Sequence, residues 1–348
     1  MKRTARIACL LPLLLLASSL FVRSAGAAAP ASGYHVLKTI PVGGEGGWDY
    51  LTVDSEARRL YVTRGTRVMV FDADSGKPVG EIPNLSGVHG VAVAPDSGRG
   101  FVSNGKSGTV TIFDSKTLKV LGEVKATGEG PDAIIYDPAS KRVFSFNGRG
   151  KNTTAIDAAT GQVAGTIDLG GKPEFAAADG KGRVFVNIED RNEVVVLDSA
   201  KLTILGHWPL PGCEEPSGMA IDRQHGHLLI GCGNKVAMIV DIAGGKVIAT
   251  PPIGEGVDAN GYDPGTNLGF ASTGSGTLTV LREASPGKWT AENVPTAAGA
   301  RTMALDEKTH NVFLVTAKFG PRPAPTAQEP HPRPTMVPGS FVILVVGR

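Results

Sequence analysis

The chain has 348 residues, with 35 basic and 33 acidic side chains and a formal net charge of +2. No basic run stands out from this balance, so the footprint of a nucleic-acid-binding surface is missing and we expect no nucleic-acid partner. The 46 glycines and 24 prolines interrupt the chain at short intervals, and no segment shows an apolar stripe at helical spacing, which favours an all-β protein.

The first 27 residues have the three parts of a secretion signal. Residues 2–6 carry three basic side chains, 7–22 form an almost unbroken apolar run, and 25–27 read Ala-Gly-Ala, which fits the pattern before a cleavage site. The alternative is a retained membrane anchor. Against it, Pro12 interrupts a run of only sixteen residues, which is short for a membrane-spanning helix.

We therefore expect a signal peptide over 1–27, a short linker over 28–33, and a periplasmic or secreted mature chain that is not stably inserted in a membrane. Residues 1–27 contain four basic side chains and no acidic one, so the remainder has 31 basic against 33 acidic side chains, a formal charge of −2. The apparent basicity of the chain belongs to the signal.

A sequence repeat determines the predicted fold. Seven short segments align, and the steps between their first residues are 40, 43, 42, 43, 41 and 43. The side chains of each segment are mostly small and apolar, as those of an innermost strand must be where propeller blades crowd around an axis. The segments are 49–54, 89–94, 132–137, 174–179, 217–222, 258–263 and 301–306.

Each repeat has room for four strands. In the second repeat a turn follows 89–94, then a β-branched and aromatic strand at 101–104, an alternating strand at 110–114 and a fourth strand at 119–124. Four strands in one such repeat make a propeller blade. The sequence thus predicts a seven-bladed β-propeller with four-stranded blades over 34–348.

The last repeat explains the two ends of the propeller. It supplies a second strand at 311–316 and a third at 341–346, and then the chain stops. Residues 36–42 match the fourth strand of the other repeats. We expect this N-terminal strand to close the last blade, which removes the free sheet edges that invite aggregation.

Three segments carry a resemblance to a known family. Leu60-Tyr61-Val62-Thr63, Phe101-Val102-Ser103-Asn104 and the stretch 109–114 (Thr-Val-Thr-Ile-Phe-Asp) resemble the YVTN repeats of YncE-like periplasmic propellers. The resemblance covers 34–348 and implies the fold and an envelope location. It does not imply one activity, because seven-bladed propellers serve as binding platforms, lactonases, lyases and dehydrogenase subunits.

The first residues of the seven innermost strands are all polar and should surround the mouth of the central channel. One interpretation is that the mouth is simply wet, with carboxylates tying neighbouring blades together. The other is a ligand or metal pocket, in which Asp132, Glu174 and Asp258 are candidate ligands for Ca²⁺ or another hard divalent cation. The seven residues are Asp49, His89, Asp132, Glu174, Ser217, Asp258 and Arg301.

The ends of the second strands should lie at the same face. Of these, Arg64, Asn104 and Asn147 are candidate ligand-binding residues. Lactonase-type propellers bind a metal through carboxylate and asparagine side chains at the mouth, and Asn104 and Asn147 beside Asp132 would form an analogous cluster. The competing interpretation is that asparagine stands there for the geometry of the turn.

Two features break the regularity of the repeat. Residues 318–340 form a proline-rich loop in the last blade, and we expect it to act as a lid through Arg322, His331 and Arg333. The alternative is a mobile loop in solvent without a function in binding.

Cys213 and Cys232 approach the same face, so either a disulfide or two separate thiols is expected there. Trp48 either stacks on a ligand or packs between blades.

We favour a binding platform over an enzyme: a monomer that binds a protein or small-molecule ligand at the channel mouth. The alternative is a metal-assisted hydrolase or lyase at the same mouth. In that case Asp49, Asp132, Glu174 or Asp258 would act as metal ligands or base, and His89 as acid or base.

Overall fold

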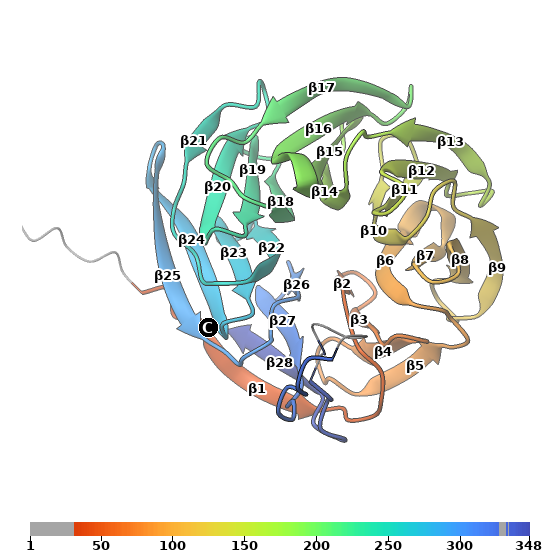
Figure 1. Ribbon diagram of the computed structural model, residues 1–348, viewed down its shortest axis with the longest axis horizontal. Coiled ribbons are helices and arrows are strands. Elements are labelled where there is room, and N and C mark those ends of the chain that lie inside the picture. Colours follow the sequence, from red (N-terminus) through yellow and green to blue (C-terminus); the bar gives the residue numbers. More distant parts are fainter. Residues whose placement is uncertain (1–30, 327–331, 333) are drawn as a thin grey trace, which may run out of the picture. The chain divides into compact units, whose positions relative to one another are not determined.

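Seven four-stranded antiparallel sheets are arranged in a ring in the computed structural model (Figure 1). The structure describes residues 31–326, 332 and 334–348, and its compact unit runs from Ala31 to Arg348. The predicted seven-bladed β-propeller is confirmed. The predicted signal peptide lies outside the described residues. Within the described part of the chain, no helix is long and apolar enough to cross a membrane.

Each blade runs from an innermost strand at the axis to an outer strand at the rim. The innermost strands are β2 (Leu51–Asp54), β6 (Val88–Ala94), β10 (Pro131–Asp137), β14 (Pro173–Ala178), β18 (Pro216–Asp222), β22 (Val257–Asp263) and β26 (Met303–Asp306). The second strands are β3 (Arg59–Thr63), β7 (Arg99–Asn104), β11 (Arg142–Asn147), β15 (Arg183–Ile188), β19 (His227–Cys232), β23 (Leu268–Thr273) and β27 (Asn311–Thr316).

The third strands are β4 (Val68–Asp72), β8 (Thr109–Asp114), β12 (Asn152–Asp157), β16 (Glu193–Asp198), β20 (Val236–Asp241), β24 (Thr277–Ser285) and β28 (Val342–Gly347). The outer strands are β5 (Pro78–Ile82), β9 (Val120–Lys125), β13 (Val163–Asp168), β17 (Thr203–Pro209), β21 (Val247–Ala249), β25 (Lys288–Pro295) and β1 (His35–Pro41). Two short 3₁₀ helices, η1 (Pro95–Ser97) and η2 (Glu189–Arg191), complete the regular structure of the described residues.

The core lies between blades. Phe101, Phe144 and Phe185 are fully buried on their second strands, where aromatic side chains fill the space between adjacent sheets. Burying one such ring stabilises the fold by roughly 1.5–3 kcal/mol. The outer strands are much more exposed, as β9 illustrates. The blades are therefore held by their inner three strands.

The N-terminal strand closes the ring as predicted. β1 pairs antiparallel with β28, from His35 opposite Gly347 to Pro41 opposite Val342. Ser32, which lies within the predicted linker, is buried, and its backbone N–H donates to Glu292 Oε2 at 2.6 Å.

Candidate functional site

A β-bulge occurs near the start of the innermost strand in five blades. In β6 the register shifts between Val88 and Val91, and β10, β14, β18 and β22 shift at the matching position. A bulge bends its strand and re-aims a side chain. The bulged stretches contain His89, Asp132, Glu174, Ser217 and Asp258.

The side chains at the strand starts meet in one cavity of about 620 Å³. Six of the seven predicted residues line it, and His89 contacts two of them. Carboxylates outnumber cations among the lining residues by seven to two. The lining residues used below are Asp49, Tyr50, Asp132, Lys172, Glu174, Glu189, Glu215, Ser217, Glu255, Asp258 and Arg301. We call this space the acidic cavity.

Aromatic side chains meet across the axis next to the acidic cavity. Tyr50, which lines the cavity from the first blade, has its ring centroid 4.4 Å from that of Phe175 in the fourth blade. Burial raises the pKa of Tyr50 well above its ordinary value, and the surrounding carboxylates add to the rise. The cavity therefore has an apolar, neutral side against which charges are poorly solvated.

His89 bridges two carboxylates of neighbouring blades. Its Nδ1 lies 2.6 Å from Asp49 Oδ2 and 3.3 Å from Asp132 Oδ1. Burial alone would lower the pKa of His89, but the hydrogen bond to Asp49 and the charge of Asp132 raise it above its ordinary value. The imidazole is thus biased toward its cationic form and holds the two carboxylates together.

Three carboxylates of the cavity have raised pKa values. Burial raises the pKa of Asp132 to about 6 even though His89 opposes the change, and raises that of Asp258 to about 6 against the effect of Arg301. Burial and the charge of Asp132 raise the pKa of Glu174 to about 7. The common cause is negative charge held in poorly solvated space, a state that a bound cation would relieve.

Lys172 belongs to the cavity and was not among the predicted residues. Its Nζ lies 2.7 Å from Glu174 Oε1 and also contacts Glu189. Burial would lower the pKa of Lys172, but these two hydrogen bonds raise it above its ordinary value. Lys172 therefore offsets part of the negative charge and fixes the position of Glu174.

A second alignment column could have revealed two of the missed residues. Two positions before each strand start, the repeat has glycine in five blades, but Lys172 in the fourth and Glu215 in the fifth. Four of those glycines have φ from 66° to 78°, and Glu215 adopts φ 49° in the same left-handed region. A non-glycine residue is disfavoured at such a φ, so Glu215 beside a cavity is a candidate for a functional role, while the backbone of Lys172 does not adopt a positive φ.

Arg64, Asn104 and Asn147 are buried and do not line the acidic cavity, and their role in ligand binding stays a prediction. All three are buried, with at most 1% of their surface exposed. The amide of Asn104 donates to Thr109 and Thr111, and that of Asn147 donates to Asn152 and Thr154, all within their own blades. The side chains of Asn104 and Asn147 thus turn into the hairpin that follows each second strand.

Arg64 instead supports a group of aromatic rings. Its guanidinium donates to the carbonyl oxygens of Gly43 and Glu45 and lies 3.7 Å from the centroid of Phe341. Phe341 packs against Trp48 at 5.1 Å, and Trp48 against Phe319 at 5.9 Å. Burial lowers the pKa of Arg64 to about 10, which leaves it charged at neutral pH.

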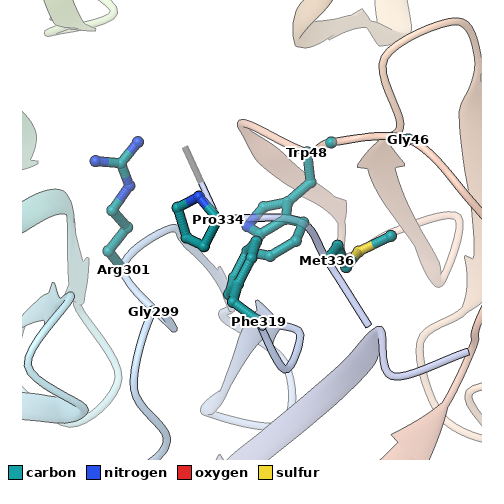
Figure 2. Close-up of a pocket in the computed structure, with 8 residues that line it drawn as sticks. Gly46, Trp48, Gly299, Arg301, Phe319, Pro334 and Met336 are labelled. Atoms are coloured by element: carbon teal, nitrogen blue, oxygen red, sulfur yellow. The ribbon is translucent and has the colours of Figure 1, made fainter. Parts of the chain in front are cut away.

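The proline-rich loop forms the wall of a second cavity of about 480 Å³ (Figure 2). Phe319, Pro334 and Met336 from the loop lie around Trp48, and Arg301 lies at the opposite side of the pocket from Met336. We call this space the aromatic pocket. Of the predicted lid residues, Arg322 is exposed and does not line it, while His331 and Arg333 lie outside the described residues. The lid remains a prediction.

Cys213 and Cys232 form a disulfide, with their Cα atoms 5.4 Å apart. It joins the turn before β18 to the end of β19 in the fifth blade. Both cysteines are buried. The covalent bond fixes the turn that carries Glu215 toward the acidic cavity.

The residues that lie close enough together to share a metal ion differ from the predicted metal ligands. Among the residues it describes, one set of three could share an ion, namely Asp49, His89 and Asp132, whose ligand atoms lie within 4.8 Å of one another. Of the predicted trio, only Asp132 belongs to this set. Glu174 is paired with Lys172, and Asp258 faces Arg301 at 3.4 Å. The set combines nitrogen and oxygen donors, which suits a transition metal better than calcium.

Comparison with known proteins identifies the fold. No family model matches the chain, and no curated protein matches it in sequence. Among solved structures, one described as "Structure of U3-55K" is similar, with a TM-score of 0.72 and 11% identity, covering 90% of this chain and 99% of that one. At this identity the likeness shows the β-propeller fold alone.

Proposed function

We propose that the protein is an exported binding platform that recognises a cationic group in the acidic cavity at the axial mouth. The observation that carries this proposal is that seven carboxylates and only two cations line one cavity. Three of these carboxylates have raised pKa values. Such carboxylates are paired incompletely inside the protein, and a ligand cation supplies the missing charge.

Export and the envelope location are part of the proposal. The sequence of residues 1–27 and the resemblance to YVTN repeats support it. The disulfide between Cys213 and Cys232 adds support, because disulfides persist in oxidising compartments.

The direct test compares two ligands that differ only in charge. N-acetylarginine amide carries a guanidinium, and N-acetylcitrulline amide is its neutral isostere. By calorimetry we expect the arginine compound to bind at least about tenfold more tightly, which corresponds to about 1.4 kcal/mol. Equal binding of the two compounds would refute cation recognition.

Variants locate the binding. Glu174→Gln and Asp132→Asn should each weaken arginine binding about tenfold, since each removes a charge-assisted partner. Glu56→Gln is the matched control. Glu56 lies in the turn after β2 and does not line the cavity, and its Oε2 lies 2.8 Å from Lys308 Nζ. Its affinity should be that of the wild type.

A second candidate is a metal-assisted hydrolase or lyase, favoured by the Asp49, His89 and Asp132 set. These residues would hold the ion, which would supply Lewis-acid activation of a substrate or water. Elemental analysis of protein purified without chelators tests this candidate. One equivalent of a divalent metal, lost in Asp49→Asn, would support it, and metal-free wild-type protein would count against it.

A further inference from the structure

The aromatic pocket is a preformed feature of the described residues. Trp48, which lines the pocket, packs against Phe341, and the guanidinium of Arg64 lies over the ring of Phe341. The two ends of the loop are held together by backbone hydrogen bonds, from Gly320 N to Thr335 O at 2.9 Å and from Val337 N to Lys318 O at 2.8 Å. The pocket wall is therefore anchored by regular contacts at its base.

This pocket leaves apolar side chains in contact with water. Phe319 is 46% exposed although it lies against Trp48, and Met336 and Pro334 are only partly buried. Exposed aromatic surface that is gathered around a hollow is typical of a binding site. An apolar side chain of a partner would fit the space of about 480 Å³.

The aromatic pocket adjoins the acidic cavity at two points. Trp48 lines the pocket and the next residue, Asp49, lines the cavity. Arg301 lines both spaces, with its side chain 60% exposed. An occupant that reaches both spaces therefore has a large apolar group next to a cationic group.

The rim of the pocket suits a polypeptide main chain. Gly46, Gly47 and Gly299 line it without side chains, and glycine permits close approach of another backbone. A Cβ placed on Gly47 would meet nothing within 4 Å, so the space above it is open. The exposed guanidinium of Arg301 can donate to a peptide carbonyl oxygen beside this rim.

We propose that the two spaces together bind one peptide segment, in which a large apolar side chain fills the aromatic pocket and a neighbouring basic side chain enters the acidic cavity. This inference rests on the proposed function, because the acidic cavity must accept the cation. It adds the identity of the partner as a basic and apolar peptide, and the requirement for Phe319, Pro334 and Met336 of the proline-rich loop.

Three capped tripeptides test the proposal on the full-length protein. Acetylated and amidated Phe-Arg-Phe should bind about tenfold more tightly than Ala-Arg-Ala and about tenfold more tightly than Phe-citrulline-Phe, measured by calorimetry. If Phe-Arg-Phe binds no better than Ala-Arg-Ala, the apolar subsite is wrong while cation recognition stands. If it binds no better than Phe-citrulline-Phe, the cation subsite fails and the coupled proposal fails with it.

Substitutions then locate the apolar gain. Met336→Ser and Gly47→Leu should abolish the advantage of Phe-Arg-Phe over Ala-Arg-Ala, the first by removing apolar surface and the second by filling the open space. Val337→Ser is the matched control, because Val337 is the next residue in the loop, is 40% exposed and does not line the pocket. An advantage that survives both substitutions would overturn the assignment. Circular dichroism confirms that each variant is folded.

Discussion

At the scale of single residues, Glu215 lines the acidic cavity from a backbone conformation that favours glycine. The repeat has glycine with positive φ at the matching position of four other blades, and Glu215 adopts φ 49° there while its side chain lines the acidic cavity. A non-glycine residue in the left-handed region costs roughly 1–2 kcal/mol. The carboxylate is thus held at the cavity against the preference of the backbone.

We expect Glu215→Gly to be more stable than Glu215→Ala by about 1 kcal/mol, because both remove the carboxylate and only glycine relieves the backbone. Both variants should bind N-acetylarginine amide more weakly than the wild type. Chemical denaturation measures the first effect and calorimetry the second. Equal stability of the two variants would show that the backbone at this position is unstrained.

The raised pKa values of Asp132, Glu174 and Asp258 make opposite demands on binding and stability. As pH falls from 8 to 5 these carboxylates take up protons, so arginine affinity should fall by about tenfold or more. Stability should change the other way. Folded-state pKa values above the ordinary ones mean that the native protein binds protons more tightly than the unfolded chain.

The contribution of these three groups to the free energy of unfolding therefore increases as pH falls from about 7 toward about 4. Asp132→Asn should remove part of this increase and should raise the melting temperature at pH 8. Thermal unfolding across this pH range measures both effects. An affinity that is flat from pH 8 to 5 would contradict the account of the cavity.

The positions of site residues were predictable where the strand order alone decides them. The start of each innermost strand lies at the mouth in every blade, so Asp49, Asp132 and Glu174 could be placed from the repeat. Arg64 and Asn104 could not, because the end of a strand does not determine which way its side chain turns, and both turn into the protein. Lys172 and Glu215 were missed because they lie two positions before the strand starts, and only an alignment of that otherwise glycine column reveals them.

At the scale of elements, the disulfide fixes the turn before β18 to the end of β19 across a sequence separation of 19. Closing a loop of this length restricts the unfolded chain and stabilises the fold by about 3 kcal/mol. We expect the double variant Cys213→Ala, Cys232→Ala to unfold at a lower temperature than the wild type, both measured without reductant. An unchanged melting temperature would indicate that the blade holds this turn without the bond.

The 318–340 loop is the element whose position could not be predicted in detail. Its length marked it as unusual, but no repeat exists from which to infer its contacts, and its packing on Trp48 depends on an aromatic group assembled from three parts of the chain. Deleting 320–338 should leave the propeller folded and arginine binding intact, while the advantage of Phe-Arg-Phe over Ala-Arg-Ala disappears. Retention of that advantage would exclude the loop from the site.

At the scale of the whole propeller, closure by β1 ties the first strand to the last. β28 has β27 on one side and β1 on the other, so removing β1 exposes a row of unpaired backbone groups. A variant lacking His35–Pro41 should be less stable and should self-associate, as measured by size-exclusion chromatography with light scattering. A stable monomer after this deletion would mean that closure contributes little.

The ring also explains why the site joins residues that are far apart in the chain. Asp49, Asp132, Glu174 and Asp258 come from four blades, and only the radial arrangement brings them into one cavity. The repeat spacing was sufficient to predict that meeting. It could not predict the imbalance of charge inside the cavity, because the loops that add Glu189 and Glu255 vary from blade to blade.

The central claim is that a ligand cation is recognised by carboxylates with raised pKa values. The most direct measurement is the number of protons released when N-acetylarginine amide binds at pH 6.5, obtained by calorimetry in buffers of different ionisation enthalpy. The account requires a net release that shrinks in Glu174→Gln, because the bound cation stabilises the ionised carboxylates. Binding without proton release, or with proton uptake, would contradict it.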